Sequence, residues 1–137
     1  MIILKSKFFL GVFGERIVHE SLPGSEWMRV GYGMGRDPFD IMWNGIKIEV
    51  KTSRSFYGDK NSFHMQFSLL RAEASIFVFL GIMGKTIYWW VKSKKEFNSS
   101  VYLKSENAFT DLSLLPIAIL KAKNRKNNDV EVAYGNS

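Results

Sequence analysis

The sequence predicts an α/β domain with a mixed central sheet flanked by helices, and three observations support this prediction. Apolar residues recur at helical spacing from about Leu4 to Leu22, and Pro23-Gly24 ends that pattern. Two short β-type runs flank Asn44-Gly45. Two apolar runs typical of strands follow later, Ile76–Gly81 and Thr86–Val91.

The remaining elements are assigned from turn residues and periodicity. We expect a strand around Trp27 to Val30, a loop from Ser53 to Ser62 and a short helix from about Met65 to Ala74. The segment Ile117–Leu120 fits either a strand or a helix. From about residue 121 the chain is basic, which predicts a flexible, solvated tail. Residues 1–137 are therefore expected to form a single domain with such a tail.

Composition excludes several classes of site. The chain has no cysteine, which excludes disulfides, thiolate catalysis and cysteine-ligated zinc, and only two histidines. No apolar run approaches the roughly 20 residues that a bilayer requires. Charged residues follow the first apolar stretch directly, which argues against a signal peptide. We therefore expect a complete, cytoplasmic protein that does not enter a membrane.

The chain is basic, with a formal net charge of +6 and a pI of about 9.6. Such a balance favours a polyanionic partner, nucleic acid before a membrane surface. Charge alone does not identify the nucleic acid, so an RNA-binding or translation-associated protein stays open on this ground.

The hairpin around Asn44-Gly45 predicts its own register. Both central residues of a type I′ turn need positive φ, which Asn and Gly tolerate best. A two-residue loop then pairs Ile41 with Ile48 and places Asp40 opposite Glu49. Opposed residues share a face, so Lys51 lies on the same face as these two carboxylates. The other face is apolar and consists of Ile41, Trp43, Ile46, Ile48 and Val50.

Opposed carboxylates destabilise a strand pair unless something neutralises them. A divalent cation with oxygen ligands would turn their repulsion into attraction, and Mg²⁺ suits such a site. The alternative is an ordinary solvated face, because Glu-x-Lys is a common pattern on exposed strands.

These residues carry a resemblance to a known family. Asp-Pro-Phe-Asp40, eight further residues and then Glu49-Val-Lys51 resemble the signature of the PD-(D/E)XK nuclease superfamily. The resemblance implies a restriction-endonuclease-like α-β-β-β-α-β core. It implies that Asp40 and Glu49 hold Mg²⁺, for which Mn²⁺ would substitute, with Val50 as a further ligand. It also implies that Lys51 orients or activates the attacking water.

The family often adds a glutamate from the first helix, and Gly11-Val-Phe-Gly-Glu15-Arg16 is similar to that element. Glu15 is therefore expected as a further catalytic and metal-binding residue, the alternative being a glutamate at the edge of the stripe paired with a lysine. Two features depart from the pattern. In the family the proline directly precedes the aspartate, whereas here Pro38 precedes Phe39. Some members carry a glutamine and a tyrosine on the following helix; Gln66 is present here, but Leu70 stands at the position of the tyrosine.

The resemblance predicts a magnesium-dependent DNA endonuclease, site-specific and of restriction or homing type. Arg36, Arg54 and Lys60 are expected to contact DNA phosphates. Of Trp89 and Trp90, one is expected in the core, which leaves the other to stack on bases. A Holliday-junction resolvase and a non-catalytic DNA-binding module are the alternatives. Cleavage of both strands implies a homodimer or a higher symmetric assembly on double-stranded or branched DNA.

Overall fold

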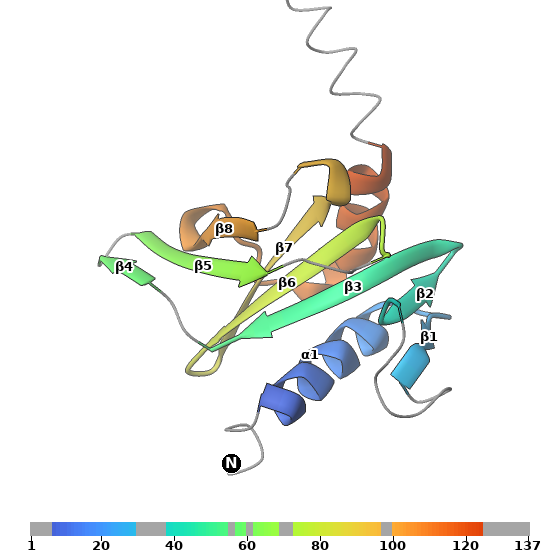
Figure 1. The fold of residues 1–137 in the computed structure, drawn as a ribbon, viewed down its shortest axis with the longest axis horizontal. Helices are drawn as coiled ribbons and strands as arrows, with labels where there is room; N and C mark the ends of the chain where they lie inside the picture. The colour runs from blue at the N-terminus through green and yellow to red at the C-terminus, as the bar shows by residue number, and fades with distance from the viewer. Residues whose placement is uncertain are drawn as a thin grey trace, which may run out of the picture.

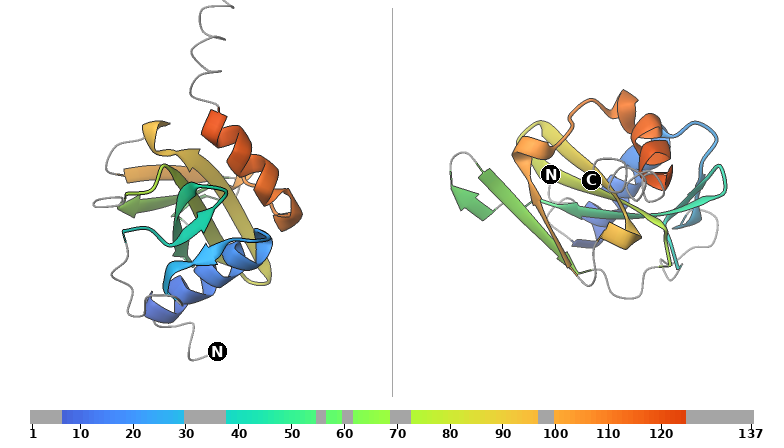
Figure 2. Two further views of the ribbon diagram at one scale, coloured as in Figure 1. Left: turned by 90° about the vertical axis from the view of Figure 1, so that its right-hand side faces the viewer. Right: turned by 90° about the horizontal axis from the view of Figure 1, so that it is seen from above.

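The computed structural model describes residues 7–29, 38–54, 57–59, 62–68, 73–96 and 100–124, with 57–59 and 62–68 described by their backbone alone. Within these ranges the chain forms a five-stranded sheet in the order β1-β2-β3-β6-β7 and a three-stranded sheet in the order β4-β5-β8 (Figure 1). The predicted α/β class with a mixed sheet is confirmed. The three-stranded sheet and the helix 115–124 lie toward opposite ends of the long axis (Figure 2).

The first three strands form an antiparallel meander. They are β1 (Glu26–Trp27), β2 (Ile41–Trp43) and β3 (Ile46–Ser53). Asn44 and Gly45 have φ of 50° and 76°, as a type I′ turn requires. Ile41 pairs with Ile48, so the predicted hairpin register is confirmed. The strand predicted around Trp27 to Val30 is shorter than expected, because Met28 and Arg29 are helical and Val30 lies outside the described residues.

A crossover then makes the sheet mixed. β6 (Ile76–Met83) pairs with β3 in parallel, and β7 (Thr86–Ser93) pairs with β6 antiparallel. The crossover contains β4 (Tyr57–Asp59) and β5 (Ser62–Ser68), of which β5 pairs with β8 (Ser100–Lys104). The loop predicted over Ser53–Ser62 is therefore partly strand. The helix predicted from Met65 is wrong over its described part, because β8 supplies a partner strand for it.

One face of the large sheet is covered by helices. The core there joins Val18 and Leu22, in or next to α1 (Lys7–Ser21), to Ile48 and Val50 of β3, and the helix 115–124 packs on the same cluster. Ile117–Leu120 is thus helical. Residues 121–124, which were predicted to belong to a tail, continue the helix, and Ala122 is buried. The rest of the predicted tail lies outside the described residues. No helix within the described ranges is long and apolar enough to cross a membrane.

The opposite face carries a second core. Phe77 and Phe79 of β6 and Trp90 of β7 pack there against Leu103 of β8. Trp89 points the other way, into the helix-covered core. Both tryptophans are buried, so the prediction that one of them stacks on bases is wrong. The sheet is covered on both faces here, which leaves neither ring exposed.

α1 runs alongside β3 (Figure 1) and approaches it most closely at Gly14. A Cβ atom at Gly14 would overlap the Thr52 hydroxyl and lie 2.9 Å from the Thr52 Cβ. The buried stripe of the helix is Gly14, Val18 and Leu22. Phe8, which falls within the helical pattern of apolar residues predicted from about Leu4 to Leu22, is 56% exposed. The Cζ atom of Arg29 lies 5.2 Å from the centroid of the Phe8 ring.

We predict that Gly14→Ala destabilises the protein by about 1–3 kcal/mol, because the added methyl group must displace β3 or the helix. Gly11→Ala is the matched control. A Cβ there would meet nothing within 4 Å, so this change should stabilise the helix by about 0.5–1 kcal/mol. Urea unfolding of the two variants measures both effects, and equal stability of the two would contradict the close approach.

Candidate active site

Asp40 lies directly before β2, beside the middle of β3. Its backbone N–H donates to the Ile48 carbonyl at 2.9 Å, and its Oδ2 accepts from the Val50 N–H at 2.8 Å. Along a strand, the N–H and C=O of one residue point to the same neighbour. The Val50 carbonyl therefore faces the side of β3 where the Asp40 carboxyl lies, beyond the end of β2.

Glu49 and Lys51 project from the opposite face of β3 to Ile48 and Val50. The Lys51 Nζ lies 3.5 Å from the Glu49 Oε2, and their side chains are 29% and 16% exposed. The Asp40 and Glu49 carboxyl groups lie close enough for their charges to interact. The predicted meeting of Asp40, Glu49 and Lys51 is thus observed, and the Lys51 ammonium remains partly open to solvent.

The two carboxyl groups are held in a state that favours protonation. Burial, then the charges of Glu49 and Glu15, raise the pKa of Asp40 from 3.8 to about 8, against the opposing effects of the Val50 N–H and Lys51. Burial also raises the pKa of Glu49, and Glu15 adds to this while Lys51 opposes it. Because its pKa is raised to about 8, the Asp40 carboxyl holds a proton at neutral pH that a cation could replace.

Glu15 is 4% exposed, deeper than an ordinary helical glutamate. Its Oε1 accepts from the Trp27 Nε1 and the Arg29 Nε, and its Oε2 from the Arg29 Nη2, each at 2.9 Å. The predicted need for a partner is met by an arginine and a tryptophan rather than by a lysine. Sequence reasoning missed both partners, although Trp27 and Arg29 lie in the strand predicted around Trp27 to Val30.

The donor set fits a divalent cation only in part. Asp40 and Glu49 supply carboxylate oxygens and Val50 supplies a carbonyl, the oxygen ligands that Mg²⁺ accepts. In the part of the chain that the structure describes, no three His, Asp or Glu side chains are grouped so as to hold a metal ion. Arg29 engages both oxygens of Glu15, so this glutamate influences the pair by its charge and is not part of a ready-made ligand group.

The structure describes only some of the other residues that the sequence predicted for the site. Arg54 is exposed directly beyond the end of β3, whereas Arg36 and Lys60 lie outside the described residues. Gln66 is in β5 rather than in a helix, and Leu70 lies outside the described residues. Of the three arginine and lysine residues expected to contact DNA, Arg54 is therefore the one that lies within the described residues.

We predict that Asp40→Asn stabilises the metal-free protein at alkaline pH. A carboxyl whose pKa is raised binds an extra proton in the folded state, so its stabilising effect is complete below the unfolded pKa near 4 and is lost as the pH rises through about 8. The amide of the variant keeps a donor for Glu49 and an acceptor for Val50 without the charge. A gain of about 1 kcal/mol would raise the melting temperature by about 4 °C.

Thermal unfolding in EDTA at pH 5, 7 and 8.5 measures this effect. The variant should exceed the wild type at pH 8.5, and the difference should shrink toward pH 5. Glu106→Gln, at an exposed carboxylate, is the control and should change little across the range. A difference between Asp40→Asn and the wild type that grows toward pH 5 would contradict the cause assigned here.

No protein-family model, curated protein or solved structure matches this chain. The membership in the PD-(D/E)XK superfamily therefore stays a prediction.

Proposed function

We propose that the chain is a magnesium-dependent DNA endonuclease that hydrolyses phosphodiester bonds at Asp40, Glu49 and Lys51. One observation carries the proposal. The Asp40 carboxyl, held by the Val50 N–H, interacts through its charge with the Glu49 carboxyl, and a lysine ammonium lies 3.5 Å from Glu49. A solvated strand face gives no reason for such a pair, since exposed carboxylates separate to avoid repulsion.

Asp40 and Glu49 would hold the cation, with the Val50 carbonyl as a third oxygen. The Val50 N–H fixes the Asp40 carboxyl in place and leaves its second oxygen for the ion. When bound, Mg²⁺ would lower the pKa of a water molecule and neutralise charge on a phosphate oxygen. Glu15 would add negative charge nearby, with its own orientation fixed by Arg29.

Lys51 is the residue that would act on the nucleophile and the phosphate. Its ammonium is oriented by Glu49 and partly exposed, so it is accessible to a substrate from solvent. A cation at this point would position the attacking water and balance the negative charge that develops on the phosphate during hydrolysis.

The sheet supports the same proposal. A meander of three antiparallel strands followed by a parallel fourth strand is the strand pattern of the predicted α-β-β-β-α-β core, with α1 before it. The crossover differs, because β4 and β5 stand in the segment where that core has a helix. We propose a restriction-endonuclease-like core in which strands occupy the crossover.

We predict Mg²⁺-dependent cleavage of DNA that Asp40→Asn, Glu49→Gln and Lys51→Ala each abolish, with a loss of at least about 100-fold for Lys51→Ala. The assay is incubation of plasmid, linear duplex and four-way junction DNA with Mg²⁺ or Mn²⁺, and with EDTA. Lys47→Ala is the matched control, because Lys47 lies on the same strand face, two residues before Glu49, and packs over the Phe39 ring. This control should cleave at the wild-type rate.

The three DNA substrates distinguish between the alternative functions. Cleavage of duplex DNA supports the site-specific restriction or homing type, and cleavage of the four-way junction alone supports a resolvase. DNA binding without cleavage in any metal would leave the non-catalytic module. A Lys51→Ala variant that cuts at the wild-type rate would refute the assignment of the site. A homodimer is proposed because two strands must be cut by chains with one site each.

Metal binding has a readout that does not depend on cleavage. We predict that Mg²⁺ raises the melting temperature of the wild type at pH 8, by the equivalent of about 2.7 kcal/mol at 100 times its Kd. Glu49→Gln should lose this shift because one of the two carboxylates is gone, whereas Lys47→Ala should keep it. An equal shift in Glu49→Gln and in the wild type would place the ion elsewhere.

A further inference from the structure

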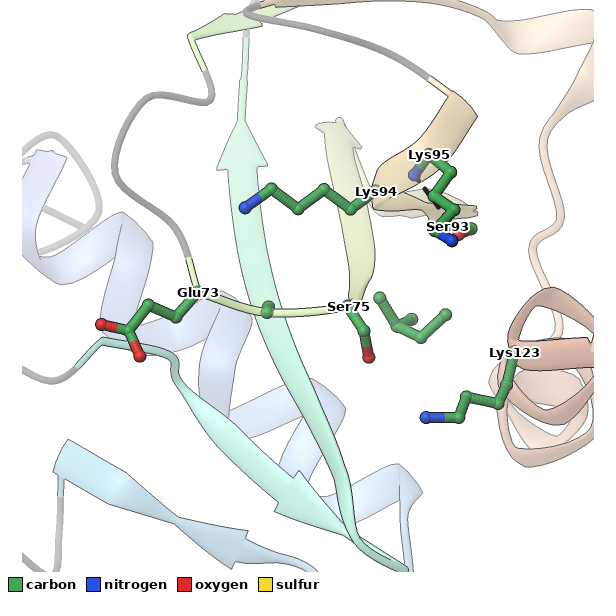
Figure 3. Close-up of a pocket in the computed structure, with 8 residues that line it drawn as sticks. Glu73, Ser75, Ser93, Lys94, Lys95 and Lys123 are labelled. Carbon is green, nitrogen blue, oxygen red and sulfur yellow. Dashed lines mark hydrogen bonds between the residues drawn. The ribbon is translucent and has the colours of Figure 1, made fainter. Parts of the chain in front are cut away.

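A hollow lies at the end of the large sheet where β6 begins and β7 ends. It has a volume of about 330 Å³ and is lined by Glu73, Ala74, Ser75, Ile76, Ser93, Lys94, Lys95 and Lys123 (Figure 3). Lys123 comes from the helix 115–124 and the other residues from the two strands and their flanks. No residue proposed for catalysis lines it.

Backbone hydrogen bonds hold several of the residues that line this hollow. The Ser75 N–H donates to the Lys47 carbonyl at 3.1 Å, and the Ser75 carbonyl accepts from the Lys94 N–H at 2.9 Å. Ile76 pairs with Ser93, and both are buried. The Ser75 backbone is thus held between β3 and the residue that follows β7, and Figure 3 shows the Ser75 hydroxyl toward the space that the Lys123 ammonium also enters.

Three of the lining residues are lysines and one is an acid, Glu73. In Figure 3 the Lys123 ammonium enters the space beside Ser75, whereas the Glu73 carboxylate and the Lys94 ammonium both point away from Lys123. Glu96, the next acid nearby, accepts from the Ser93 N–H at 2.7 Å and lies 4.0 Å from the Lys92 ammonium. An anion with several acceptor oxygens matches an ammonium with serine hydroxyls beside it.

We infer that this hollow binds a phosphate group of a nucleic-acid strand, a second contact apart from the cleavage site; the nucleic-acid identity rests on the proposed function. The segment 73–75 connects the two sites. At one end the Glu73 N–H donates to the Pro38 carbonyl at 3.1 Å, two residues before Asp40, and at the other end Ser75 lines the hollow. Three residues of extended chain span about 10 Å, within the reach of a few nucleotides of one strand.

The test compares Lys123→Ala with Lys121→Ala, an exposed lysine on the same helix that does not line the hollow. Binding of a fluorescent duplex is measured by anisotropy in EDTA, between 50 and 200 mM salt. Lys123→Ala should weaken binding about five-fold at 50 mM salt and reduce the slope of log K against log salt by about 0.9, the value for one phosphate contact. Lys121→Ala should change either quantity much less.

Two further variants separate a binding role from a structural one. Lys123→Arg should restore the salt slope, because it keeps the charge. Ser75→Ala should weaken binding without changing the slope, because it removes a hydroxyl and no charge. Circular dichroism of each variant confirms the fold.

Equal losses in Lys121→Ala and Lys123→Ala would overturn the inference and leave only a general effect of charge. Unchanged DNA binding by Lys123→Ala, together with Lys123-dependent binding of inorganic phosphate in calorimetry, would overturn the assignment to a nucleic-acid strand in favour of a free phosphate. Since binding is measured in EDTA, an absence of cleavage refutes the proposed nuclease and not this site. Cleavage by a protein whose DNA binding ignores Lys123 refutes this site alone.

Discussion

The repulsion between the Asp40 and Glu49 carboxyl groups is the constraint on which the site depends. The hairpin register brings the two strands into fixed opposition, and burial prevents water from screening the charges. In the free protein a proton on Asp40 and the Lys51 ammonium beside Glu49 relieve this repulsion. A divalent cation would also relieve it, and the same geometry would then favour the proposed metal binding.

The fold enforces this opposition from several directions. The type I′ turn at Asn44-Gly45 sets the register, and the Val50 N–H holds the Asp40 carboxyl against β3. On the helix side, Gly14 lets α1 approach β3 closely, and the next residue, Glu15, is buried as a result. The turn and the strand pair thus fix the backbone on which both carboxyl groups stand, within a packed core that resists rearrangement.

Local patterns in the sequence predict the hairpin, whereas contacts between residues far apart in the sequence could not be predicted from such patterns. Turn chemistry and alternation over 14 residues are enough to predict that Ile41 pairs with Ile48 and that Glu49 and Lys51 share a face, because register follows from nearest neighbours. Arg29 and Trp27 reach Glu15 from 14 and 12 residues away, through packing that no local pattern encodes. Residues 65–68 fit a helical pattern, yet their pairing with residues 100–103 of β8 makes them a strand. Trp89 and Trp90 are both buried because the sheet is covered on both faces, which alternation alone does not reveal.

The balance of charge among the residues of the site links the binding of a cation to the binding of a nucleic acid. With one proton on the Asp40–Glu49 pair, the remaining carboxylate is balanced by Lys51, and Glu15 is balanced by Arg29. The cluster of the free protein is then neutral. If a divalent cation replaces the proton, the cluster carries one net positive charge, and a phosphodiester carries one negative charge. The site would therefore be neutral again only with metal and substrate together, so that cation and nucleic acid favour each other's binding.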